Sequence, residues 1–231
     1  MHSDQSKETA MQFFKLVLQF TFGFSLCTIG ISQSFADYYP NDNYSSLVLS
    51  YQSSAFANPV CINNECHKGV SGPAGVFSYQ IVPNIALGLS GSYLQSSGNV
   101  SEIVATTGSV FVRGIAGVGR SVDIGASLAA LRTNLELCSS NPASCSSSAD
   151  KGTNIGVFGK YFLNDIRSMS VGLSYNYIAF QESPNQSVVT LSLVTILVKH
   201  HRLAFSVDKI LNSNGTSVSG GYGFGYSYLV F

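Results

Sequence analysis

Four cysteines carry the clearest potential for covalent chemistry in this sequence, and they lie in two close pairs. Cys61 is followed by Cys66, and Cys138 is followed by Cys145. An even number of cysteines at short spacing in an exported chain is typical of local disulfides. The alternative is a metal site that uses His67 beside Cys66, but the sequence lacks a quartet of ligands with CxxC spacing. The spacing therefore predicts two disulfides, Cys61–Cys66 and Cys138–Cys145, and no cofactor.

Histidine and carboxylate side chains are the candidates for acid–base chemistry. Glu65 and His67 flank Cys66 in the first cysteine segment, whereas His200 and His201 follow an apolar run. A histidine beside a carboxylate can act as a general base. A short polar segment between cysteines is nevertheless expected to be a solvated loop. We therefore predict that the protein is not an enzyme, and the alternative, an envelope lipid-modifying enzyme, would depend on His67.

The N-terminal segment has the features of a secretory signal. Lys15 precedes an apolar stretch from Leu16 to Ile31, and Ser34-Phe35-Ala36 supplies small residues at the two positions that a signal peptidase reads. We expect cleavage after Ala36. This gives a signal peptide at 1–36, with Met11 as an alternative start, and an exported domain at 37–231.

Composition narrows the class of protein. Only 10% of the residues are charged, acidic and basic residues are equal in number, and the mean hydropathy is +0.22. A soluble domain carries about 25% charged residues, and nucleic-acid binding needs clustered positive charge, so no nucleic-acid partner is expected. After the N-terminal segment no apolar run reaches 18 residues, which excludes helical membrane spans from the body of the chain. A disordered chain, a secreted β-sandwich and a membrane β-barrel remain.

Alternation of apolar and small polar residues predicts ten strands. The last strand is the clearest, because its aromatic residues share one face and its small residues the other; the aromatic face comprises Tyr222, Phe224, Tyr226, Tyr228 and Val230. A stripe this apolar needs a cover, and lipid is the candidate. The predicted strands span residues 44–51, 71–82, 85–94, 103–113, 121–132, 152–163, 167–179, 187–198, 202–211 and 221–231.

The predicted connections alternate in length. Long polar loops are expected at residues 52–70, 95–102, 133–150, 181–186 and 212–217, and turns at 83–84, 114–120, 164–166 and 199–201, which are shorter in every case but the second. Long loops on one rim and short turns on the other are typical of an outer-membrane barrel, and closure by an even strand number pairs every backbone group. The sequence therefore predicts an all-β fold, a single closed antiparallel transmembrane β-barrel of ten strands, with eight strands as the alternative.

The predicted barrel has a defined orientation. Both termini lie on the short-turn, periplasmic rim, and both cysteine pairs lie outside the cell. Outward tyrosines are expected to form interfacial girdles near the two rims. They are Tyr51, Tyr93, Tyr175 and Tyr177 near the long loops, and Tyr79 and Tyr161 near the short turns.

These features together resemble the small outer-membrane β-barrel proteins of Gram-negative bacteria, the porin-like superfamily. The resemblance rests on the signal peptide, the alternating strands and the terminal aromatic residue, Phe231, with Tyr228 three places before it. It implies a location in the bacterial outer membrane, in contact with outer-membrane lipid. It also implies that the barrel assembly machinery reads Phe231 and Tyr228 as an assembly signal, although the aromatic stripe is one residue out of phase with Phe231.

The predicted inward face is mostly small and polar, with few charges. Asp123 and Lys160 are expected to face each other near the periplasmic rim, either as an ion pair or as two separately solvated charges. Arg113 and Asp208 are expected in the same layer. Apolar residues predict a plug in the lower interior, formed by Phe162, Val194, Ile196 and Val198.

A lumen without wide charged rings carries no signal for ion selectivity. The sequence therefore predicts a small porin-like channel or passive transporter for small solutes. The alternative is a structural or adhesin-like surface protein that contacts its partners through disulfide-tied extracellular loops.

Overall fold

The computed structural model describes residues 45–62, 64–82, 84–118, 121–140, 143–163, 168–198, 200–211 and 218–229. Ten strands account for most of them: β1 Ser46–Ile62, β2 Glu65–Val82, β3 Ile85–Ser97, β4 Ser101–Val118, β5 Val122–Ser140, β6 Ala143–Phe162, β7 Met169–Phe180, β8 Gln186–Val198, β9 His201–Ile210 and β10 Val218–Leu229. No helix in these ranges is long and apolar enough to cross a membrane. The expected signal peptide lies outside the described residues.

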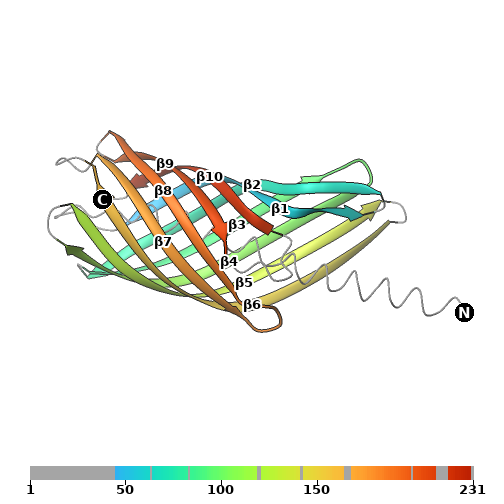
Figure 1. The fold of residues 1–231 in the computed structure, drawn as a ribbon, viewed down its shortest axis with the longest axis horizontal. Coiled ribbons are helices and arrows are strands. Elements are labelled where there is room, and N and C mark those ends of the chain that lie inside the picture. Colours follow the sequence, from blue (N-terminus) through green and yellow to red (C-terminus); the bar gives the residue numbers. More distant parts are fainter. Residues whose placement is uncertain are drawn as a thin grey trace, which may run out of the picture.

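The strands close into a single barrel (Figure 1). Each strand pairs antiparallel with its neighbours in sequence, and β1 also pairs with β10, beginning with Ser46 opposite Leu229. The predicted closed, ten-stranded antiparallel barrel is confirmed, and the eight-stranded alternative is wrong. The rim where β1 begins and β10 ends is called the inner rim below, and the opposite rim is the outer rim.

The register of the strands sets their tilt. A row of directly opposed residues can be followed round the barrel, starting from Asp123 on β5. It runs through β6 to β10, β1, β2 and β3 to Ala105 on β4; the partners on β6 to β10 and β1 are Lys160, Gly172, Ser192, Ser206, Gly223 and Gln52. Ala105 pairs with Leu135, twelve residues along β5 from the starting point. For ten strands this stagger corresponds to a tilt of about 40°. Nine to eleven residues of such a strand cross a bilayer.

The part of every strand nearer the inner rim, called the lower part below, turns apolar side chains outward. On β10, Tyr222 and Phe224 are 59% and 54% exposed, whereas Ser227 is fully buried. The tyrosines expected in the two girdles are likewise outward and exposed. Tyr177 Oη accepts a hydrogen bond from Asn185 Nδ2 at 2.7 Å, so its hydroxyl meets the polar rim. This inside-out pattern is stable only with lipid around the barrel, which makes it a transmembrane β-barrel.

Three of the predicted long loops are wrong, because most of their residues are strand. Residues 52–70 extend β1 and β2 to a tight turn in which Asn64 has a φ of 67°, a conformation that asparagine tolerates. Residues 133–150 extend β5 and β6 to 19 and 20 residues, and residues 95–102 are strand except for Gly98–Val100. The predicted turn at 114–120 is also mostly strand, since β4 continues to Val118.

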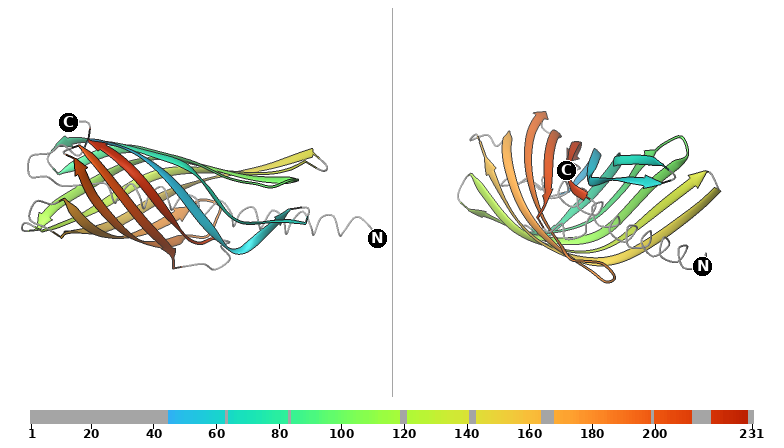
Figure 2. Two further views of the ribbon diagram at one scale, coloured as in Figure 1. Left: turned by 90° about the horizontal axis from the view of Figure 1, so that it is seen from above. Right: turned by 45° about the vertical axis from the view of Figure 1, so that its right-hand side comes forward.

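The remaining outer connections differ from these. β7 ends at Phe180 and β8 begins at Gln186, in agreement with the expected loop there, and the loop expected at 212–217 lies outside the described residues. Strands β1–β6 therefore extend beyond β7–β10 at the outer rim, as one side of the barrel drawn out from the membrane (Figure 2).

Candidate functional site: the barrel interior

A charged layer lies inside the barrel near the inner rim. Asp123 is the second residue of β5 and lies directly opposite Lys160, near the end of β6. Both side chains are buried, at 1% and 4% exposure. Lys160 Nζ is 5.1 Å from the ring centroid of Phe162, which places an aromatic face beside the cation. The register brings the two charges together, and their role as a lock across the wall stays a prediction.

Arg113 belongs to the same end of the lumen, whereas Asp208 does not. The Arg113 guanidinium lies 5.2 Å from the ring of Phe111 and 5.4 Å from that of Phe158. Asp208 is near the outer end of β9, opposite Thr190 and Gly221. The expectation that Arg113 and Asp208 share one layer is therefore wrong, because β9 runs from the inner rim outward and places Asp208 six residues beyond Arg202.

Apart from Asp150, the buried charge among the described residues that was not predicted from the sequence is Arg202. It is 1% exposed and is the second residue of β9, at the inner rim. Its signal was the inward alternation of Arg202, Ala204, Ser206 and Asp208. Across the described part of the chain the buried charges are balanced, with three cations and three carboxylates: Arg113, Lys160, Arg202, Asp123, Asp150 and Asp208. The six charges sum to zero but are unevenly placed, since the three cations and Asp123 lie toward the inner rim and Asp208 lies near the outer end of β9.

Uncharged polar side chains occupy the middle of the lumen. Asn154 Nδ2 donates to Asn176 Oδ1 at 3.3 Å. Asn154 and Thr190 are at most 2% exposed, and Asn154 Oδ1 and Thr190 Oγ1 have no hydrogen-bond partner among the described residues. Thr133 and Gln186 are also buried, but they lie nearer the outer rim, Thr133 between Leu131 and Leu135 and Gln186 opposite Ile178. Buried polar groups of this kind bond to water or to a ligand. This layer can therefore offer hydrogen bonds to a small solute.

The outer half of the interior is filled with apolar side chains. We call this group the outer apolar cluster; it comprises Phe56, Val60, Ile62, Val70, Leu94, Ile103, Ala105, Leu131, Leu135, Leu137, Ile178, Phe180, Val188 and Ile210. Leu94, Ile103, Leu135 and Ile178 have no measurable exposure. The sequence predicts an apolar plug in the lower interior. Phe162 and Val194 are buried there, but Ile196 is partly exposed and the side chain of Val198 lies outside the description.

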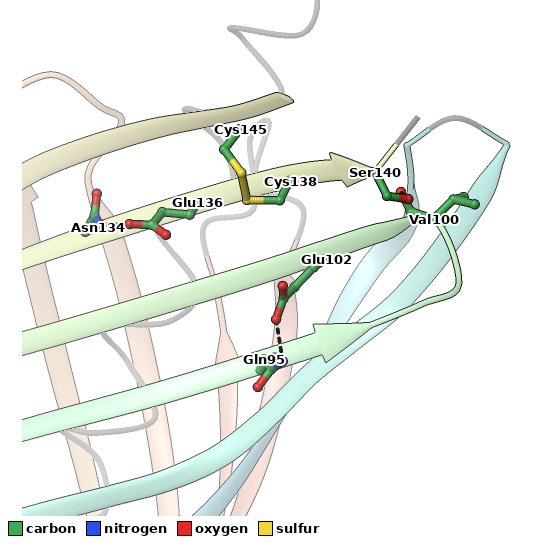
Figure 3. The surroundings of a disulfide bond; sticks show 8 residues. All are labelled: Gln95, Val100, Glu102, Asn134, Glu136, Cys138, Ser140 and Cys145. Carbon is green, nitrogen blue, oxygen red and sulfur yellow. Dashed lines mark hydrogen bonds between the residues drawn. A yellow bond between two sulfur atoms is a disulfide. The ribbon is translucent and has the colours of Figure 1, made fainter. Parts of the chain in front are cut away.

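Both predicted disulfides are present. Cys61–Cys66 and Cys138–Cys145 link directly opposed residues at the outer ends of β1–β2 and β5–β6, with Cα atoms 4.0 and 4.1 Å apart. Figure 3 shows the second bridge and, on the neighbouring strands, the hydrogen bond from Gln95 to Glu102. Ser140 at the end of β5 also donates from its backbone N–H to the Val100 carbonyl at 2.9 Å. The bridges therefore close strand ends, not loops.

His67 is not in a solvated loop, contrary to expectation. It lies on β2, is 5% exposed, and its Nδ1 and Nε2 are each 2.8 Å from a serine oxygen, in Ser96 and Ser101 respectively. The Ser101 hydroxyl donates to Glu65 Oε2 at 2.6 Å. In a nucleophilic relay the carboxylate orients the histidine, whereas here the carboxylate contacts the serine. The sequence could not reveal this cluster, because the serines come from β3 and β4.

Glu65 ties the first outer hairpin to the second. Its carboxylate accepts hydrogen bonds from the backbone N–H groups of Asn99, Val100 and Ser101 at 2.6, 3.1 and 2.8 Å. Hydrogen bonds to the charged form, led by that of the Ser101 hydroxyl, lower the pKa of Glu65 from 4.5 to about 2. At neutral pH this carboxylate is therefore ionised and holds the β3–β4 turn.

Tyr228 lies on the outward face at the inner rim, with its ring centroid 5.4 Å from that of His201. Phe231, the other half of the expected assembly signal, lies outside the described residues. The role of the two residues in assembly stays a prediction.

No protein-family model matches the chain, and no curated protein matches it in sequence. Solved structures match the fold. The translocator domain of the autotransporter NalP from Neisseria meningitidis aligns with a TM-score of 0.50 at 11% identity, over 97% of each chain. An outer membrane channel of Pseudomonas putida F1 aligns with a TM-score of 0.45 at 9% identity, over 84% of this chain and 97% of that one.

The attachment invasion locus protein Ail of Yersinia pestis aligns with a TM-score of 0.41 at 12% identity, over 80% of this chain and 96% of that one. The likeness to the NalP translocator domain is one of fold alone. This chain forms a closed, lipid-belted transmembrane β-barrel.

Proposed function

We propose that this outer-membrane barrel is a passive transporter for small uncharged solutes, with the outer apolar cluster as its selective constriction. The observation that carries the proposal is the division of the lumen into a polar lower part and an apolar outer part. A solute meets hydrogen-bonding groups such as Asn154 and Thr190 on one side of the constriction. It must pass apolar side chains such as Leu94 and Leu135 on the other.

An apolar constriction discriminates by hydration. Hydrophobic pore segments exclude water and thereby block hydrated ions more strongly than neutral molecules. The buried charges of the described residues sum to zero, so the interior as a whole carries no net charge that would attract an ion. A ten-stranded barrel is also near the size at which side chains fill the interior, so the solutes must be small. The expected behaviour is slow uptake of small neutral molecules with very low ion conductance.

The test compares two transport measurements on the purified barrel. Liposome swelling with a small polyol such as erythritol should exceed that of protein-free liposomes, while planar bilayers show ion conductance well below that of an open porin. The Leu94→Ser, Leu135→Ser double variant should raise ion conductance by about tenfold or more, because it places hydroxyls in the constriction.

Leu89→Ser is the matched control. It makes the same change on β3, but the side chain faces outward and is 55% exposed, so conductance should stay at the wild-type value. Heat-modifiable gel migration would verify that each variant is a folded barrel. A folded protein that takes up no solute, and whose double variant conducts no better than wild type, would overturn the proposal.

A further inference from the structure

The outward face of the barrel carries a feature that the lumen does not explain. A surface hollow of about 890 Å³ lies across β3 to β7, and its border includes Leu89, Val110, Ala130, Arg132 and Lys151. Leu89 and Val110 are 55% and 59% exposed, so the apolar wall of the hollow is turned toward the membrane. The apolar belt is therefore indented at this position.

Two cations lie side by side at the upper border of this hollow. Arg132 on β5 is directly opposite Lys151 on β6, and both side chains are exposed. On β5 the outward residues below Arg132 are apolar, ending with Leu128 and Ala130. The arginine is thus the first charged outward residue above the belt, at the level where hydrocarbon gives way to lipid head groups.

The surface beside the two cations is indented because glycines, which have no side chain, occupy the neighbouring strands. Gly108 on β4 lies directly opposite Arg132, and Gly91 on β3 lies opposite Gly108. A Cβ atom built on Gly108 would meet no atom within 4 Å. The space in front of Gly108 is therefore open, and it continues from the cations down to Leu89 and Val110.

We propose that this hollow binds a phosphate-bearing lipid of the outer leaflet. Arg132 and Lys151 hold the phosphate, and an acyl chain lies over Gly108 and Val110. A guanidinium presents a planar pair of donors to phosphate oxygens, and an adjacent ammonium adds a point charge. The lower part of the hollow is apolar and lies directly below the paired cations. A lipid has the same arrangement, because its apolar tail extends from its anionic head. A soluble phosphate would use only the upper half of the hollow.

Carboxylates near the two cations weaken their attraction for a phosphate. Glu182 follows Gln181, whose backbone N–H donates to the Lys151 carbonyl, so Glu182 is an exposed carboxylate close to this part of β6. Asp150 precedes Lys151 but is buried, and Glu136 is two outward positions above Arg132. Glu182→Gln should therefore strengthen lipid binding.

The experiment measures binding of diphosphoryl lipid A to the mature barrel in detergent by native mass spectrometry, with the dephosphorylated lipid as the reference. Wild type should bind the phosphorylated form preferentially. The Arg132→Ala, Lys151→Ala double variant should bind it about tenfold more weakly. Lys209→Ala is the matched control, since Lys209 is an exposed outward lysine on β9 whose register partners are Val189 and Gly220.

A second variant distinguishes binding of a lipid from binding of a free phosphate. Gly108→Leu fills the apolar part of the hollow and keeps both cations. It should therefore weaken lipid binding by about the same factor as the Arg132→Ala, Lys151→Ala double variant. It should leave the weak competition by inorganic phosphate unchanged. The proposal is overturned if the double variant binds lipid A as well as Lys209→Ala does, or if Gly108→Leu binds it as well as wild type. Neither result would affect the transport measurements, so this inference and the proposed function fail separately.

Discussion

The two halves of strand β5 turn their apolar side chains in opposite directions. The apolar face of the lower half points outward, and that of the upper half points inward. In the lower half, Ile124 and Leu128 point outward while Asp123 and Ser127 point inward. In the upper half, Arg132 and Glu136 point outward while the inward residues, Thr133 apart, are apolar: Leu131, Leu135 and Leu137. The alternation never breaks, but its sense reverses near Ala130. The comparison shows that a single strand can pass from lipid into water by exchanging which face is apolar.

The reversal follows from the solvent on the outside. Within the bilayer the exterior is hydrocarbon, so apolar side chains belong there and the small polar ones line the lumen. Above the bilayer the exterior is water, and the strands can be stable only if they bury apolar side chains on their inner face. The outer apolar cluster is that buried face. It is therefore the core of a water-exposed β-structure built on top of a membrane barrel.

The largest effect is expected from a charge placed on the inner face of the upper half. Leu135→Asp buries a carboxylate among apolar side chains and should lower the free energy of unfolding by about 4 kcal/mol. Asn134→Asp adds the same charge one residue away, on the outward face, and should change it by less than about 0.5 kcal/mol. Urea unfolding in lipid vesicles measures both. Equal effects would contradict an apolar core above the membrane.

A smaller effect is expected from a charge on the outward face of the lower half. Leu128→Arg places a cation in the lipid belt and should cost about 3 kcal/mol. Glu136→Arg, on the same face of β5 but above the belt, should cost close to nothing. The same unfolding assay applies to both. If the two arginines were equally tolerated, the boundary between lipid and water would not lie between these positions.

The smallest effect concerns the tie between the outer hairpins. Because its folded pKa is lowered to about 2, Glu65 stabilises this region fully above its unfolded pKa of about 4.5, and the contribution is lost as the pH falls through about 2. The backbone amide resonances of Asn99 and Ser101 should titrate with a midpoint near 2. Glu65→Gln should abolish that titration. A midpoint near 4.5 in the wild-type protein would show that the carboxylate does not accept these hydrogen bonds.

The comparison also explains which parts of the fold could be predicted from sequence. The lower halves of the strands follow one rule, apolar outward and small or polar inward, so their number, their order and the Asp123–Lys160 alignment could be predicted. The upper halves follow the inverse rule with serine-rich faces. In residues 133–150 the polar residues suggested a loop, although Leu135 and Leu137 continue the alternation begun by Leu131.

The interior could be predicted only in part for the same reason. The outer apolar cluster draws Phe56, Val60 and Ile62 from one segment assigned as loop, and Leu135 and Leu137 from another. A segment predicted to be a loop has no predicted inner face, so these apolar side chains could not be placed in the interior from the sequence. The His67 contacts depend on Ser96 and Ser101, which lie about thirty residues away in sequence and meet His67 only through the register of β2, β3 and β4.

The seam between β1 and β10 has a consequence for the order of folding. Every other strand pair joins neighbours in sequence and can form as a local hairpin, but Ser46 must find Leu229. Loop-closure entropy makes such a distant pairing slow, and until it forms two strand edges stay unpaired. The whole chain must therefore be delivered to the membrane before the barrel can close, and any factor that guides assembly would act on these two edges.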